Sequence, residues 1–449
     1  MKMKSFLLML GAALVMAGSV SAGDIVVHKS GRYFQDATGK PFFFIGYYSW
    51  ASVAPGYYNN SPQTYTEMIL KGAPHNVKYV RFSLGINALG GKGTRYWEVH
   101  PTPTPFVYER GKANLDKWNP EFWNGLKYYC AMSRTHGVVL HVCLFDGVDF
   151  RGGKEQHRWI NSFWNVKNQT RNFYGDLDLD HDGNADVAGE FYRLADFKNN
   201  TGVGKYQRKV IDKALAVIAP YDNVFLEIGN ELMDSPADWN DAVAAYVRTK
   251  TKKAITQSGG KLGLTVNGFS EHNPDTPAMV RDELPGMVGY GCPAWLDPDG
   301  SRLMDAGPDD LRRSAWYSFA GGAAGWGGFN GGYWSRNPSE SALKYFGHLD
   351  KFIRESGIKF WEMRPWQAMI LNTKTSSCLV KLGKEYLVYA LEDPKVWVNL
   401  NSIYNKAVVR IYNPKTGVWG AKQVISGGGT RRFDKPAGMD DWVIYIKAL

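Results

Sequence analysis

The sequence predicts an α/β protein, a (β/α)8 TIM barrel followed by an antiparallel β-sandwich. First, apolar strand-like runs alternate with helical segments between residues 42 and 355. Second, these runs are apolar on both faces, which is typical of a parallel sheet covered by helices. Third, from about residue 362 the chain changes to short alternating strands with Asn-Pro and Gly-rich turns. An open doubly wound sheet is the alternative for the first part, but no GxGxxG or Walker segment favours it.

Eight barrel strands are expected, in order, at residues 42–50, 77–84, 138–146, 223–228, 262–267, 287–291, 294–297 and 323–329. The helix before the third strand is the best marked, because Asn119 can cap it, Pro120 suits its first position and Gly137 ends it. A later helix is expected at about 239–257. No helix fits between the sixth and seventh strands, so one unit is degenerate or one strand is misplaced.

The N-terminal 22 residues have the features of a secretory signal peptide. Lys2 and Lys4 precede an apolar stretch, and small residues around Ala22 suit cleavage. We therefore expect a signal peptide at 1–22, the barrel at 23–361 and the β-sandwich at 362–449. The protein should be secreted or periplasmic, because no later run is long enough to span a membrane and no Cys near the cleavage site could carry a lipid.

The formal net charge of +10 is carried by scattered basic residues. This scatter does not indicate a nucleic-acid-binding stripe, and it leaves a polyanionic substrate open. The sequence does not determine the oligomeric state.

Polar and aromatic side chains gather where the expected strands end. In a parallel barrel, the carboxyl ends of the strands form the active-site mouth. Glycosidic cleavage needs two carboxyl groups there, and Trp and Tyr rings can stack on sugars. The candidates for substrate binding at this mouth are Tyr47, Trp50, Arg81, Asp146, Asn230, Glu271, Tyr290 and Trp326. Glu231 is the candidate acid. Its alternative role is in the first turn of a helix that Asn230 caps.

Two motifs carry a family resemblance. VRFSLG, with Arg81, and LEIGNEL, with Asn230 and Glu231, resemble strands two and four of the large clan of (β/α)8 retaining glycoside hydrolases. The segments GRYFQDATGKPFFFIG, LRRSAWYSFAGGAAGWGG and FDKPAGMDDWVIYIK are similar in order to the apiosidase-like branch of that clan, including its appended β-domain. The resemblance implies that Glu231 is the general acid/base and that Asn230 contacts the sugar 2-hydroxyl.

The chain departs from this clan at the second carboxylate. The clan's nucleophile is a Glu at the end of strand seven, whereas PAWLDPDG offers Asp297 and Asp299. We favour Asp299 over Asp297, with Glu271 as the third choice. A plain turn is the alternative interpretation of Asp-Pro-Asp-Gly. An Asp in place of Glu would lengthen the carboxyl separation and favour inversion over retention.

The segment DLDHDGNAD resembles a calcium-binding loop in its spacing. Asp178, Asp180, Asp182, Asn184 and Asp186 could surround a hard cation, with Gly183 permitting the tight turn. Gly189 stands where an EF-hand has its bidentate Glu, so we expect a lone structural Ca2+ loop rather than a sensor. A solvated acidic loop is the alternative. No organic cofactor is expected.

Together these features predict a secreted glycoside hydrolase that acts on a polysaccharide or oligosaccharide. Two other roles are left open: a barrel that binds carbohydrate without cleaving it, and a calcium-braced surface adhesion protein.

Overall fold

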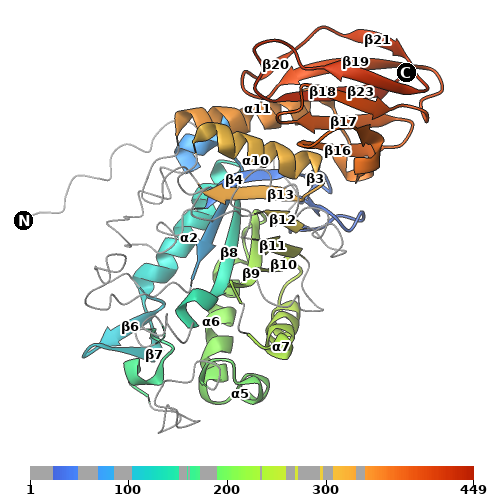
Figure 1. Ribbon diagram of the computed structural model, residues 1–449. Helices are drawn as coiled ribbons and strands as arrows, with labels where there is room; N and C mark the ends of the chain where they lie inside the picture. Colours follow the sequence, from blue (N-terminus) through green and yellow to red (C-terminus); the bar gives the residue numbers. More distant parts are fainter. Residues whose placement is uncertain are drawn as a thin grey trace, which may run out of the picture.

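The computed structural model describes residues 24–48, 69–84, 104–150, 159, 162–171, 190–232, 235–258, 268–271, 294–296, 307–329 and 339–449. Eight parallel strands close into a barrel, as predicted, and Figure 1 shows the helices around them. Around the barrel the strands are β4 (Phe44–Tyr48), β5 (Tyr79–Ser83), β8 (Val139–Asp146), β9 (Val224–Asn230), β10 (Ile255–Ser258), β11 (Gly268–Glu271), β12 (Ala294–Leu296) and β13 (Gly325–Phe329). The expected barrel is thereby confirmed.

The fifth strand of the barrel lies where the sequence predicted a helix. α7 (Ala237–Arg248) ends well before residue 257, and β10 (Ile255–Ser258) pairs in parallel with β9 and β11. The sixth strand of the barrel is β11, whereas residues 287–291 were expected in that position. The expected strands at 262–267 and 287–291 themselves lie outside the described residues. All four residues of β10 are buried, and four residues are too few to show a period.

The other helices follow the expected alternation. They are α2 (Pro120–Thr135), α5 (Leu194–Asn199), α6 (Gly202–Ile218), α10 (Pro308–Ala320) and α11 (Glu340–Ser356). Asn119 caps α2 as predicted, because its Oδ1 accepts a hydrogen bond from the Glu121 amide at 3.1 Å. Within the part of the chain that the structure describes, no helix is long and apolar enough to cross a membrane.

Short elements complete the first part of the chain. A small antiparallel sheet precedes the barrel, with strands β1 (Val26–Val27), β2 (Phe34–Gln35) and β3 (Pro41–Phe42). A hairpin of β6 (Phe106–Glu109) and β7 (Lys112–Trp118) follows β5 along the chain. The 3-10 turns are η3 (Ala73–His75), η4 (Gly147–Phe150), η6 (Val166–Asn168), η7 (Phe360–Glu362) and η8 (Gln367–Met369).

The C-terminal region is a sandwich of two antiparallel sheets. The large sheet runs in the order β14 (Arg364–Pro365), β16 (Ser376–Lys381), β17 (Glu385–Ala390), β23 (Trp442–Ala448), β19 (Lys406–Asn413) and β20 (Val418–Trp419), with β21 (Gln423–Ser426) also paired to β19. The small sheet has the order β15 (Ile370–Leu371), β18 (Lys395–Asn399) and β22 (Thr430–Asp434).

The large sheet is buried on both faces along its central strands, β16, β17 and β23. Along β17, Leu387 and Tyr389 face α10 and α11 and belong to the hydrophobic core that includes Trp316. The alternate residues Tyr386 and Val388 face the small sheet and belong to a second core. Figure 1 shows α10 and α11 between the barrel strands and the large sheet. The sandwich and the barrel are therefore joined through one continuous apolar core.

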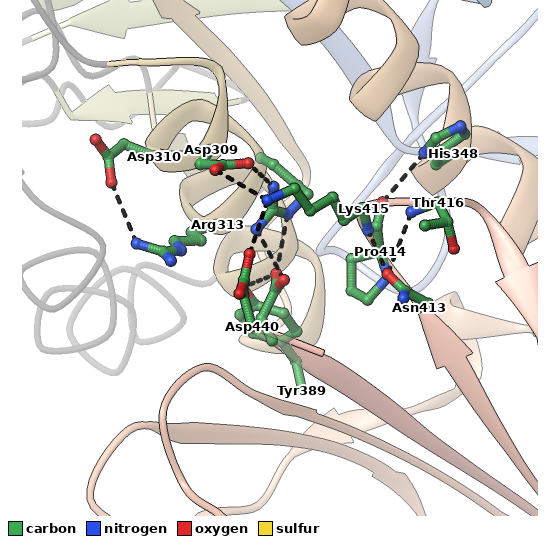
Figure 2. A network of polar contacts seen from close by, with 12 residues as sticks. Asp309, Asp310, Arg313, His348, Tyr389, Asn413, Pro414, Lys415, Thr416 and Asp440 are labelled. Atoms are coloured by element: carbon green, nitrogen blue, oxygen red, sulfur yellow. Dashed lines mark hydrogen bonds and ion pairs between the residues drawn. The ribbon is translucent and has the colours of Figure 1, made fainter. Parts of the chain in front are cut away.

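A buried ion pair reinforces this junction. Arg312 on α10 donates from Nη2 to Asp441 Oδ1 (2.8 Å) and from Nε to Asp441 Oδ2 (3.1 Å), and neither side chain is exposed. The hydroxyl of Tyr389 donates to Asp441 Oδ2 at 2.8 Å. At the rim of the junction, Lys415 reaches Asp440 and Asp309 (Figure 2).

Candidate active site

A buried arginine organises the polar side chains at the β5–β8–β9 side of the barrel. Arg81 lies in the middle of β5 and donates from Nε and Nη2 to the two carboxylate oxygens of Glu227, each at 2.7 Å. Its Nη2 also donates to Asn230 Oδ1 at 2.8 Å. Two parallel N–H···O bonds to one carboxylate fix the guanidinium plane, so Arg81 holds Asn230 at a defined position near the end of β9.

Asn230 joins Arg81 to Asp146. The strand register pairs Asp146, the last residue of β8, with Asn230, the last residue of β9. The Nδ2 of Asn230 donates to Asp146 Oδ1 at 3.1 Å. An arginine can only donate and a carboxylate can only accept, so these two neighbours fix which end of the amide is oxygen. The structure thus brings together three of the predicted residues, Arg81, Asp146 and Asn230, all buried.

A second polar layer lies deeper in the barrel. His141 on β8 lies 3.6 Å from Glu227 Oε2, and its two ring nitrogens lie 2.8 Å from the hydroxyls of Tyr79 and Thr256. Full burial raises the pKa of the Glu227 carboxyl above its ordinary value, and the Arg81 guanidinium opposes that rise.

Sequence reasoning missed Glu227. The available signal was a lone carboxylate inside the apolar run VFLEIGN, which must find a buried cation because an isolated buried charge is costly. Arg81 is that cation, two strands away.

Glu231 occupies a kink directly after β9. Its φ is +46°, a left-handed conformation that is uncommon for a residue with a side chain. The next residue, Leu232, is buried, and its amide donates to the Ser258 carbonyl at the end of β10 (3.0 Å). The left-handed residue thus interrupts the extended backbone directly after Asn230, while Leu232 keeps the contact with β10 that β9 already makes at Leu226.

Two glycines make room for this kink. A Cβ placed on Gly147, the residue after Asp146, would lie 2.4 Å from the Glu231 carbonyl oxygen and 2.8 Å from that of Asn230. A Cβ on Gly229 would lie 2.6 Å from Leu232 Cδ2. The contact at Gly147 is with backbone, so glycine is required there for the chain to turn as it does at Glu231. The contact at Gly229 is with a side chain, so a larger residue there would force Leu232 to move.

The helix-cap interpretation of Asn230 and Glu231 is wrong. α7 begins at Ala237, and its N-cap residue is Pro236. Asn230 lies in β9 and Glu231 outside any helix, so neither residue satisfies the first turn of α7. The structure instead places both residues at the carboxyl edge of the barrel.

One residue that was predicted at the active-site mouth lies elsewhere in the fold. Trp326 on β13 is fully buried, donates from Nε1 to Ser314 Oγ at 2.8 Å and packs against Phe346 of α11 at 5.0 Å between ring centres. Its ring fills the layer between the strands and the helices, so the prediction that it stacks on a sugar is wrong.

The other candidates are described in part or lie outside the described residues. Tyr47 lies in β4 and Glu271 ends β11, level with Leu296 of β12. Asp297 follows Leu296 directly in the sequence. The candidates that lie outside the described residues are Trp50, Tyr290, Asp297, Asp299, Asp178, Asp180, Asp182, Asn184 and Asp186. Across the described ranges, no group of three or more His, Cys, Asp or Glu residues could hold a metal ion.

The comparisons relate the fold to glycoside hydrolases. A structure titled "Glycoside hydrolase" matches with a TM-score of 0.64 at 14% identity, covering 95% of this chain and 97% of its own. A family 5 glycoside hydrolase from Bacteroides vulgatus matches with a TM-score of 0.62 at 14% identity, covering 95% of this chain and 94% of its own. A maltogenic alpha-amylase from Thermotoga neapolitana gives 0.55 at 10% identity, covering 90% and 99%.

The sequence comparisons add one partial match. The family described as a putative collagen-binding domain of a collagenase matches residues 365–447, the β-sandwich. No curated protein sequence matches the chain significantly. The chain therefore shares its barrel fold with glycoside hydrolases, and the apiosidase-like branch stays a prediction.

Proposed function

We propose that the protein is a glycoside hydrolase in which Glu231 is the general acid and Asp299, or else Asp297, is the second carboxylate. The observation that supports this most is the position of Asn230 and Glu231. They follow β9 at the carboxyl edge of a (β/α)8 barrel, outside any helix, and Arg81 and Asp146 hold Asn230 in place. This is the edge at which barrel enzymes carry their chemistry.

The proposed reaction begins with proton donation. Glu231 gives its proton to the glycosidic oxygen as the bond from that oxygen to the anomeric carbon breaks, and the second carboxylate stabilises the positive charge that develops on the sugar. If the two carboxyl groups are close, the second attacks the anomeric carbon and water later releases the sugar. If they are further apart, the second carboxylate takes a proton from a water that attacks directly. Asn230 would contact the sugar 2-hydroxyl.

The test compares wild type with Glu231→Gln on a panel of plant and microbial glycans, with new reducing ends as the readout. We expect activity in the wild type and a loss of at least a hundred-fold in Glu231→Gln. The exposed Glu392→Gln serves as the matched control and should keep full activity. Equal activity of Glu231→Gln and wild type would exclude Glu231 as the acid.

A second set of variants addresses the partner carboxylate. Asp299→Asn and Asp297→Asn are measured beside Glu271→Gln, because Glu271 ends the sixth strand of the barrel and the two Asp residues come just after the seventh in the sequence. We expect the largest loss in Asp299→Asn. The anomeric configuration of the first product, followed by NMR, distinguishes retention from inversion.

We also propose a structural Ca2+ in the loop at 178–186. The proposal rests on the spacing of its acidic residues, since Asp side chains this close repel one another unless a cation neutralises them. Removal of calcium with EGTA should lower the melting temperature of the wild type and leave that of Asp180→Asn unchanged. Identical responses in the two proteins would contradict the proposal.

We propose export by a signal peptide at 1–22, which leaves a barrel from 23 to 361 and a β-sandwich from 362 to 449. The sequence of those first residues supports it. The intact mass of the protein recovered outside the cytoplasm should correspond to a chain that begins at Gly23.

A second candidate function is carbohydrate binding by the barrel without cleavage. The observation that favours it is the absence of Glu from PAWLDPDG, where strand seven ends. In that case every glycan that binds would stay intact, and Glu231→Gln would bind it as tightly as the wild type does.

A further inference from the structure

The small sheet of the C-terminal sandwich exposes its outer face. The central strands of the large sheet, β16, β17 and β23, are buried on both sides. The small sheet turns Ile370, Val396, Val398 and Phe433 inward toward the second core. The opposite side chains of the small sheet point away from the barrel. We call the face formed by Leu371, Lys395, Trp397, Asn399, Thr430, Arg432 and Asp434 the distal face.

Trp397 lies at the centre of the distal face. β18 is the middle strand, and Trp397 is its middle residue. The strand registers place Leu371 on one side of it and Arg432 on the other. The Arg432 guanidinium lies 5.8 Å from the indole ring centre, and Leu371 is 43% exposed. An aromatic side chain surrounded by polar and charged side chains is a common arrangement at binding sites.

The polar groups on this face suit a sugar. Lys395 and Asn399 flank Trp397 along β18, and they pair across the sheet with Asp434 and Thr430. The face thus combines an aromatic ring, two cations, a carboxylate, an amide and a hydroxyl, and Arg432 donates from Nε to Asp434 Oδ1 at 2.9 Å. The two cations outnumber this carboxylate, so the face keeps a net positive charge. Rings of this kind can stack on sugars, while amides and hydroxyls can exchange hydrogen bonds with sugar hydroxyls.

The size of the distal face excludes a protein partner held by this face alone. Three strands about 4.8 Å apart, with five residues rising about 3.3 Å each, span roughly 10 by 13 Å. A stable protein interface buries about 800 Å² on each partner, several times this area. A short stretch of a polysaccharide chain matches the face much better.

The charge of the sandwich favours an anionic ligand. Residues 365–447 contain 12 Lys and Arg against 6 Asp and Glu, a surplus of +6 (12 − 6). Three of the six acidic residues, Glu385, Asp393 and Asp441, are buried, so the surface of the sandwich is more basic than this count. A basic surface attracts polyanions over distances of about 10 Å at moderate salt.

We propose that the distal face binds an acidic polysaccharide, with a sugar ring on Trp397 and uronate carboxylates paired to Arg432 and Lys395. This site would hold a polymer on the sandwich, apart from any bond cleavage in the barrel. It does not depend on the role proposed for Glu231.

The test measures binding of the full-length protein to polygalacturonate by affinity electrophoresis, with neutral galactan as the comparison polymer. All variants are made in the Glu231→Gln form, and the length of the polymer is checked after each run, so binding can be evaluated even if Glu231 is not the acid. We expect retardation by polygalacturonate and about ten-fold weaker binding in Trp397→Ala. Trp366→Ala is the matched control, because Trp366 is 43% exposed in the same sandwich but lies outside the distal face.

Arg432→Gln provides a second variant. The Arg432 side chain is exposed, so its replacement should leave folding unchanged. It should weaken binding several-fold and reduce the dependence of binding on salt. Binding that is unchanged in both Trp397→Ala and Arg432→Gln would overturn the proposal. The proposal would also be overturned if the wild type did not bind polygalacturonate, or if it bound immobilised collagen through the distal face instead.

Discussion

Gly147→Ala should reduce catalysis without removing any catalytic group. The added Cβ would lie 2.4 Å from the Glu231 carbonyl oxygen, whereas ordinary contacts begin at 3.4 Å. The two backbones must therefore separate by about 1 Å (3.4 − 2.4 Å). A misplacement of about 1 Å at a reacting group can cost 10²-fold in rate, equivalent to about 2.7 kcal/mol in the activation free energy. We expect kcat to fall by about that factor, with a smaller change in KM.

The assay is hydrolysis of aryl glycosides with good and poor leaving groups. A poor leaving group needs the proton from Glu231, so its kcat should fall more than that of a nitrophenyl substrate. Gly420→Ala is the matched control, because its Cβ would make only ordinary contacts, the shortest at 3.4 Å, in the sandwich. If Gly147→Ala folds and retains kcat within a few-fold of wild type for both classes, the kink does not position the acid.

Three further predictions concern stability. Glu231→Gly should exceed Glu231→Ala in unfolding free energy by about 1 kcal/mol in urea denaturation, because glycine adopts a φ of +46° without strain; equal values would mean that the kink is unstrained. Arg312→Met should cost about 3–5 kcal/mol of unfolding free energy, since it leaves the buried Asp441 carboxylate without its guanidinium. Arg313, whose side chain is 29% exposed, pairs with Asp310 of its own helix, so Arg313→Met should cost less than about 1 kcal/mol; similar costs would contradict a stabilising role of the buried pair. Burial lowers the pKa of His348, whose Nδ1 donates to the Pro414 carbonyl at 3.2 Å, so the unfolded chain binds the proton more readily and stability should decline as pH falls below about 6.5. A melting-temperature profile of His348→Asn should lose that part of the decline.

Part of the candidate site could be predicted because its residues lie in or directly after long apolar runs. Asp146 and Asn230 follow long strands, and Arg81 lies within a third, so counting strands was enough to place them together. The register of β8 against β9 then brings Asp146 level with Asn230. A long apolar run and the polar residue at its end can be recognised in the sequence, because both are local patterns of neighbouring residues.

The features that sequence reasoning missed depend on distant partners. β10 has four buried residues, and its strand character comes from pairing with β9 and β11 rather than from its own pattern. Trp326 lies in GWGGF, where three glycines carry no side chain that could show which face points inward. The kink at Glu231 depends on Gly147 from another strand-loop unit, a close approach that no local pattern reveals.

The large sheet packs against α10 and α11 of the barrel, and this contact restricts the order in which the chain can fold during synthesis. Trp316 of α10 stacks on Tyr389 at 5.9 Å, and Phe352 of α11 meets Tyr445 at 5.7 Å. The sides of α10 and α11 that pack on the large sheet therefore remain exposed to solvent until β17 and β23 have left the ribosome. The barrel can reach its final stability only after β23 has been synthesised, so a chain truncated before β23 exposes a large apolar surface, and such surfaces aggregate readily.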